Sequence, residues 1–97
     1  MGYVKLPKAA IASGVEQFDI LYAENIASIK LGSATDVEII VSYFGVAVHE
    51  VKIIPATGTD FMQADVQAVV EAVGLISGGS GMINVSLSQK VKELTIS

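Results

Sequence analysis

The alternation of apolar and polar residues in the middle of the chain predicts a β-hairpin. β-Branched runs at 37–43 and 47–54 flank the short segment 44–46, in which Gly45 supplies the positive φ that a tight loop needs. In the register that we favour, Glu38 lies opposite Lys52, an opposite-charge pair across the two strands. We therefore expect these runs to form an antiparallel pair with one almost purely apolar face.

The other face of this hairpin mixes polar residues with large apolar ones. The apolar residues on this face are Ile40, Phe44, Val48 and Ile54. A sheet face washed by solvent rarely carries so many apolar side chains. We therefore expect a helix or a second subunit to cover them, and we take these four residues as the candidate oligomer interface.

A helical spacing of apolar residues follows the hairpin and predicts one helix over about 60–76. Thr59 or Asp60 offers a side-chain N-cap, and with Asp60 at the cap Gln63 occupies the position that a capping box requires. The expected apolar stripe contains Met62, Val66, Val69, Val70, Val73 and Ile76. Because valine is a poor helix former, packing rather than intrinsic propensity must hold this helix.

Shorter segments with a period of two predict further strands at 17–22, 26–31, 83–88 and around 94–96. Residues 1–14 contain Pro7, which cannot donate to a strand ladder, so we expect an edge strand or an N-terminal arm there. The order of strands, one helix and strands predicts a single α+β domain over residues 1–97 with a mostly antiparallel sheet. Five or more short strands in so small a chain favour a strongly bent β-barrel.

The composition adds an expectation about assembly. Of the 97 residues, 52% are hydrophobic and only 16% are charged. A chain of this length buries roughly 60–65% of the surface of its unfolded state. The uncharged stretch at 72–89 is interrupted by glycine, serine and asparagine, which argues against a membrane span. We therefore expect a homo-oligomer that covers the surplus apolar surface.

The charged residues give little support for a polyanion-binding surface. The formal net charge is −4, and the sequence contains six lysines and no arginine. Lys30 and Lys52 are the lysines that fall on the predicted sheet, and Tyr43 and Phe44 could stack on bases beside them. These four residues are the candidate nucleic-acid contacts, and the alternative is that the two aromatic residues are core and rim residues of the hairpin.

No catalytic or metal-binding constellation is recognisable in the sequence. Cysteine is absent, and His49 is the only histidine. Glu50 points to the opposite face of the strand and cannot orient that imidazole as a base. The acidic residues are dispersed without zinc or calcium spacing. We therefore expect a non-enzymatic protein without a cofactor or a metal.

Several short segments resemble a family of small proteins from marine phages, of the kind found in cyanophages and in ocean metagenomes. The segments are Glu24-Asn25-Ile26, Thr35-Asp36-Val37, Pro55 to Asp60, and Asn84-Val85-Ser86-Leu87. The resemblance implies an Sm-like fold, assembly into a ring and a role in binding nucleic acid. The Met-Asn and Arg-Gly signatures of Sm proteins are absent, and the predicted helix follows the hairpin instead of preceding the strands.

Two functional hypotheses result. The first is a non-enzymatic, ring-forming Sm-like protein of phage origin that binds single-stranded RNA or DNA in the cytoplasm of an infected bacterium. The second is a structural or accessory virion protein with no nucleic-acid role. Neither hypothesis involves a membrane.

Overall fold

The computed structural model describes residues 2–7, 18–33, 35–44 and 49–96. Within these ranges the chain forms seven strands and one helix. In chain order they are β1 (Gly2–Pro7), β2 (Phe18–Tyr22), β3 (Ile26–Leu31), β4 (Ile39–Tyr43), β5 (His49–Pro55), α1 (Gln63–Ile76), β6 (Gly81–Asn84) and β7 (Val91–Ile96).

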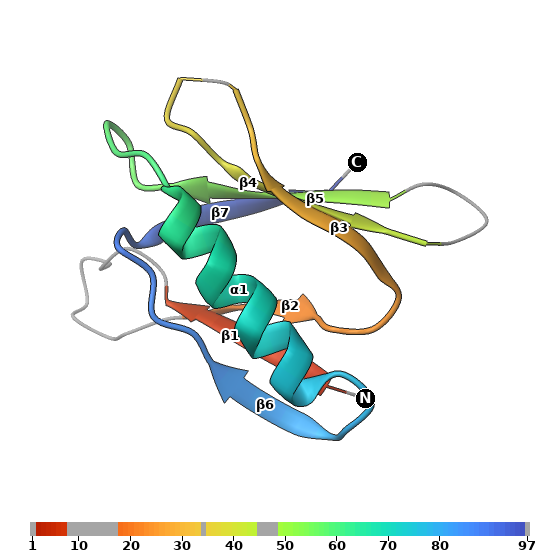
Figure 1. The fold of residues 1–97 in the computed structure, drawn as a ribbon. Coiled ribbons are helices and arrows are strands. Elements are labelled where there is room, and N and C mark those ends of the chain that lie inside the picture. The colour runs from red at the N-terminus through yellow and green to blue at the C-terminus, as the bar shows by residue number, and fades with distance from the viewer. Residues whose placement is uncertain (1, 8–17, 34, 45–48, 97) are drawn as a thin grey trace.

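The described strands form two sheets, one with the order β2-β1-β6 and one with the order β3-β4-β5-β7. All pairings are antiparallel except the parallel pair of β1 and β6. The two sheets lie one above the other in Figure 1, and α1 runs across one side of both, packed against β1, β3 and β6. The α+β class with mostly antiparallel pairing is thus confirmed, whereas the described strands form two open sheets and no closed barrel.

The N-terminal strand differs from the prediction, because β1 is the central strand of its sheet and not an edge or an arm. Val4 and Leu6 are completely buried between the two sheets. Pro7 is the last residue of β1, so it ends the strand without interrupting the ladder. Residues 8–14 of the predicted arm lie outside the described residues.

The central hairpin has the predicted buried face but a different register. Ile39 lies opposite Ile53 and Val41 opposite Val51, a shift of two residues from the predicted pairing. A shift of two keeps every side chain on its face, so these four residues are buried as expected.

The predicted pair of Glu38 and Lys52 is wrong, since Lys52 lies opposite Ile40. The observed register aligns apolar residues across all four strands, and one such row runs Leu31–Ile39–Ile53–Leu94, with its two central members fully buried. Packing in such rows outweighs one exposed ion pair, which contributes about 1 kcal/mol or less.

The helix begins at Gln63 and not at Asp60, and its first turn is held by a different acid. Met62 is the N-cap, and its amide N–H donates to Asp65 Oδ2 over 2.8 Å. Asp60 Oδ1 instead accepts from the Val37 amide over 2.8 Å and ties the approach to the helix to the start of the hairpin. The predicted cap at Asp60 is therefore wrong.

The buried face of α1 is also rotated relative to the predicted stripe. Its buried residues are Asp65, Val66, Val69 and Ala72. Met62 and Val70, both assigned to the stripe from the sequence, are exposed. The helix buries the small Ala72 and the hydrogen-bonded Asp65, and it leaves the larger side chains of Met62 and Val70 in solvent.

Candidate functional site

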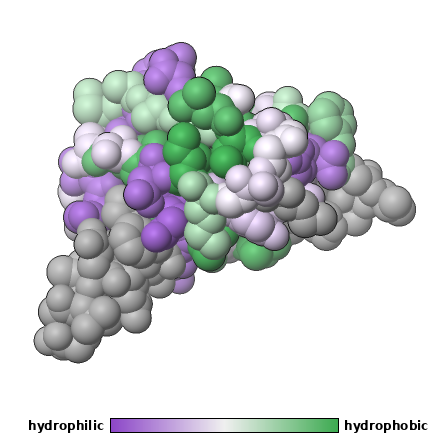
Figure 2. Space-filling view, turned by 90° about the horizontal axis from the view of Figure 1, so that it is seen from below, coloured by the Kyte–Doolittle hydropathy of each residue, from purple (hydrophilic) through white to green (hydrophobic). Residues whose placement is uncertain are grey.

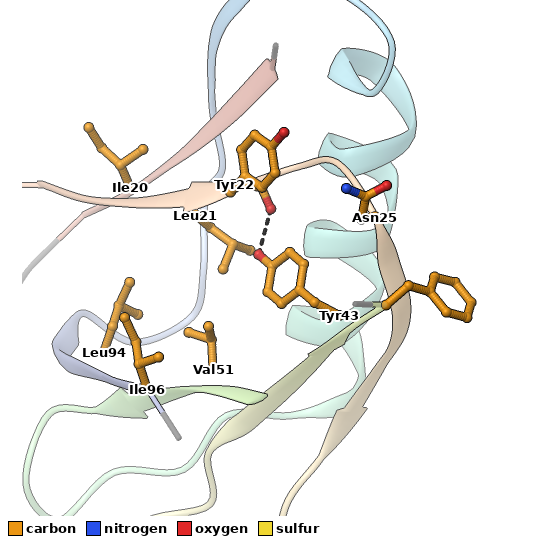
Figure 3. A pocket seen from close by; sticks show the side chains of 9 residues that line it. Ile20, Leu21, Tyr22, Asn25, Tyr43, Val51, Leu94 and Ile96 are labelled. Atoms are coloured by element: carbon orange, nitrogen blue, oxygen red, sulfur yellow. Dashed lines mark hydrogen bonds between the residues drawn. The ribbon is translucent and has the colours of Figure 1, made fainter. Parts of the chain in front are cut away.

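The candidate site is an apolar groove of about 340 Å³ where β2 of one sheet faces β5 and β7 of the other. Nine residues line it, namely Ile20, Leu21, Tyr22, Asn25, Tyr43, Phe44, Val51, Leu94 and Ile96. In Figure 3 Ile20 and Leu21 lie above Leu94, Ile96 and Val51, and α1 runs to the right of them, behind Tyr43. None of the lining residues belongs to α1, so the helix does not cover this groove.

Two tyrosines close one end of the groove. The Tyr43 hydroxyl donates a short hydrogen bond to the main-chain oxygen of Tyr22, drawn as a dashed line in Figure 3. The two rings are stacked, with centroids 6.5 Å apart and planes at 22°. Burial, reinforced by the neighbouring Tyr22, raises the pKa of Tyr43 to about 12, so this hydroxyl stays protonated at neutral pH. Tyr43 therefore joins the two sheets.

Three of the seven large apolar side chains that are exposed among the described residues line this groove. Ile20 is 48% exposed, and Phe44 and Ile96 are each 71% exposed. Ile20 and Ile96 belong to strands at the edges of the two described sheets. Burying such side chains is favourable by about 25 cal/mol of free energy for each Å² of apolar surface removed from water. The groove therefore has the character of a contact surface.

The apolar surface continues from the groove onto the outer face of the β2-β1-β6 sheet. Tyr3 lies opposite Tyr22 on one side and Met82 on the other, so the three form one row across this sheet. The Tyr3 and Tyr22 rings are 5.8 Å apart and tilted by 50°. Figure 2, viewed from the side of this sheet, shows hydrophobic surface gathered in the middle of the face between hydrophilic patches.

The structure separates the four residues predicted as an oligomer interface. Ile40 and Ile54 are only partly exposed on the outer face of the β3-β4-β5-β7 sheet, which α1 leaves uncovered. Phe44 lines the groove, and Val48 lies outside the described residues. Three of the exposed large apolar side chains therefore lie at the groove and not on the face that was predicted from the sequence. Sequence reasoning missed Ile20 and Ile96, because their exposure depends on two edges that meet only in three dimensions.

The four predicted nucleic-acid residues likewise divide between two places. Lys30 and Lys52 line a second depression of about 370 Å³, together with Glu38. Tyr43 and Phe44 line the apolar groove instead, and the Tyr43 ring is stacked on Tyr22. The lysines and the aromatic residues therefore do not form one stacking platform.

Apart from these two depressions, the described ranges offer few candidate binding groups. No group of three histidine, cysteine or acidic side chains within them could hold a metal ion. The side chain of His49 is among those that are not described. The described helix is too short to cross a lipid bilayer.

Comparison of this chain with models of protein families, with curated proteins and with solved structures finds no match.

Proposed function

We propose that this protein is a non-enzymatic subunit that assembles with copies of itself, and that the groove between β2 and β7 forms the contact. The observation that carries the proposal is the clustering of Ile20, Phe44 and Ile96 around one cavity. Monomeric proteins rarely expose a large continuous apolar patch, and larger patches mark interaction sites. The row of Tyr22, Tyr3 and Met82 extends the same surface.

The sheet edges beside the groove support the same function. β2 is an outer strand of one described sheet, and β7 is an outer strand of the other. An outer strand presents main-chain N–H and C=O groups that a strand from another chain can pair with. A neighbouring copy would thus gain main-chain hydrogen bonds in addition to apolar burial.

A ring is the assembly that the resemblance to Sm-like phage proteins implies. A head-to-tail contact between different surfaces of the subunit gives a ring where its rotation closes and a filament where it does not, whereas a contact of one surface with itself gives a dimer. β2 approaches β7 on one side of the molecule, as expected if the two sheets are parts of one strongly bent Sm-like architecture. In a phage, such a subunit would serve as a structural or accessory virion protein.

A charge introduced into the groove should prevent assembly without unfolding the subunit. We expect Ile96→Glu to raise the dissociation constant of the oligomer at least about tenfold, because the contact would bury an unpaired carboxylate. Size-exclusion chromatography with light scattering measures the mass, and circular dichroism checks the fold.

The matched control is Leu75→Glu. Leu75 is 76% exposed, close to the 71% of Ile96, and it does not line the groove. Assembly by Leu75→Glu but not by Ile96→Glu supports the groove as the contact. Equal assembly by both variants would refute it.

Binding of single-stranded RNA or DNA is the second candidate function. The observation that favours it is the placement of Lys30 and Lys52 on either side of Ile40 on one sheet face. A ring would repeat this pair in every subunit and add up the attraction for phosphates. Glu38 in the same depression and the net charge of −4 reduce that attraction.

This second function predicts a salt-dependent complex with oligonucleotides. If the two lysines contact phosphates, the double variant Lys30→Gln/Lys52→Gln should reduce the slope of log affinity against log salt by about 1.4, at roughly 0.7 for each single-strand contact. Fluorescence anisotropy with a labelled oligouridine or oligothymidine measures the slope. No binding at micromolar protein and low salt would exclude the function.

A further inference from the structure

The depression on the outer face of the β3-β4-β5-β7 sheet combines two cations with one nearly buried acid. Lys30, Leu31, Gly32, Ser33, Glu38, Ile40 and Lys52 line it. Lys30 and Lys52 lie directly opposite Ile40 on the strands at its two sides, so the two lysines flank one apolar residue in the depression. This face is separate from the groove proposed as the contact between subunits.

Glu38 is the unusual member of this set. Only 6% of its surface is exposed, yet no hydrogen bond or ion pair engages its carboxylate within the part of the chain that the structure describes. Its carboxylate oxygens are not among the fully buried side-chain oxygens that lack a partner, so they reach solvent at the depression. They can therefore accept a hydrogen bond from a donor placed there.

Gly32 fixes the position of that carboxylate. The amide of Gly32 donates to the main-chain oxygen of Glu38 over 2.7 Å, which holds the two residues side by side. A Cβ added at Gly32 would come within 1.6 Å of Glu38 Oε1. The acid therefore lies over the glycine, in space that any other residue would occupy.

We propose that this depression binds a small phosphorylated sugar, with the phosphate between Lys30 and Lys52 and a sugar hydroxyl donating to Glu38. Two ammonium groups suit a phosphate, because hydrogen bonds between ionised partners are about twice as strong as neutral ones. A carboxylate repels phosphate but accepts from hydroxyls, as acidic residues do from ribose in dinucleotide-binding folds. Ile40 offers the apolar floor on which a sugar ring can lie.

The charges of the site argue against other ligands. A divalent cation would meet two lysines, and a bare polyanionic backbone would meet Glu38. A ligand that carries both a phosphate and hydroxyl donors satisfies all three side chains. The proposal does not depend on assembly through the groove and is tested separately from it.

Ribose 5-phosphate is the probe, titrated into the wild-type protein at low salt in a calorimeter. We expect Lys30→Gln and Lys52→Gln each to weaken binding about tenfold, in line with the loss of one charge-assisted contact. Lys92→Gln is the matched control, since Lys92 is an exposed lysine on β7 outside the depression. Equal weakening by Lys92→Gln, or no binding of ribose 5-phosphate by the wild type, would overturn the proposal.

Inorganic phosphate separates the role of Glu38 from that of the lysines. Glu38→Gln and Gly32→Ala should each weaken ribose 5-phosphate several-fold, and neither should weaken inorganic phosphate, because Glu38 contacts only the hydroxyl. Wild-type protein that binds phosphate as tightly as ribose 5-phosphate would refute the hydroxyl contact. Adenosine 5′-monophosphate distinguishes the source of the ligand: tighter binding than ribose 5-phosphate indicates a nucleotide, and weaker binding indicates a free sugar phosphate.

Discussion

Val69→Asp is expected to unfold the domain, whereas Val70→Asp at the next position should leave it folded. Val69 is completely buried in the core between α1 and the sheets, and Val70 is 42% exposed. An unpaired carboxylate at position 69 adds a desolvation cost to the lost packing, together about 4 kcal/mol or more. That cost approaches the whole stability of a small domain, which is about 5–15 kcal/mol.

The two variants carry the same substitution on the same helix, so the comparison cancels the low helix propensity of aspartate. Thermal unfolding followed by circular dichroism measures both. We expect no cooperative transition for Val69→Asp, and for Val70→Asp a loss of about 1 kcal/mol or less. Unfolding by both variants would mean that α1 buries the stripe predicted from the sequence, which contains Val69 and Val70, and unfolding by Val70→Asp alone would contradict the observed burial of Val69.

The second large effect is expected at Asp65, which joins the start of α1 to the segment that leads into β7. Asp65 Oδ1 accepts from the Ser88 amide over 2.7 Å, and Oδ2 accepts from the Ser88 hydroxyl over 2.6 Å. Oδ2 also accepts from the Met62 amide at the N-cap. Asp65→Ala leaves these donors without an acceptor and should cost about 3 kcal/mol, since a hydrogen bond to a charged group contributes about 1.5–3 kcal/mol. Urea unfolding measures the loss.

The same carboxylate makes stability depend on pH. Burial tends to raise the pKa of Asp65, but the hydrogen bonds from Ser88 and Met62 outweigh burial and lower the pKa below its ordinary value. The contribution of Asp65 is therefore complete above the pKa of the unfolded chain, about 4, and is lost as the pH falls through the folded pKa. Asp65→Asn removes this titration. An acid-induced loss of stability that is as steep in Asp65→Asn as in the wild type would contradict this role.

Local sequence patterns predicted the strands well where apolar and polar residues alternate regularly. The two-residue alternation at 37–43 and 47–54 identified β4, β5 and their buried face, because alternation depends only on the side that faces the core. The register was not accessible in the same way, since it depends on the alignment with β3 and β7 on the flanking sides. The predicted register was chosen because it places Glu38 opposite Lys52, and that pair says nothing about how β3 and β7 align with the hairpin.

The central place of β1 shows a second limit of local reasoning. β1 pairs with β6, and Gly2 lies opposite Gly81 although the two are 79 positions apart in the chain. Pro7 favoured an edge strand, but this proline only ends β1. Contacts between such distant segments leave no periodic signal in either one.

The candidate site was predicted only in part for the same reason. The composition indicated surplus apolar surface, and Phe44, predicted on a face that a helix or a second subunit covers, is 71% exposed beside the groove. Its companions Ile20 and Ile96 come from opposite parts of the chain and meet at the groove only after both sheets form. Lys30 and Lys52 were singled out from the sequence and do share a depression, whereas the burial of Glu38 beside them was not foreseen.

Sedimentation equilibrium of the wild-type protein tests self-assembly most directly. The subunit mass is 10.1 kDa, and we expect a mass that is an integer multiple of this value at micromolar concentrations and above. A ring predicts three or more subunits, and a dimer would instead indicate a contact of the groove with itself. A mass of one subunit throughout, up to hundreds of micromolar protein, would contradict the proposal that the groove between β2 and β7 is covered by another copy of the chain.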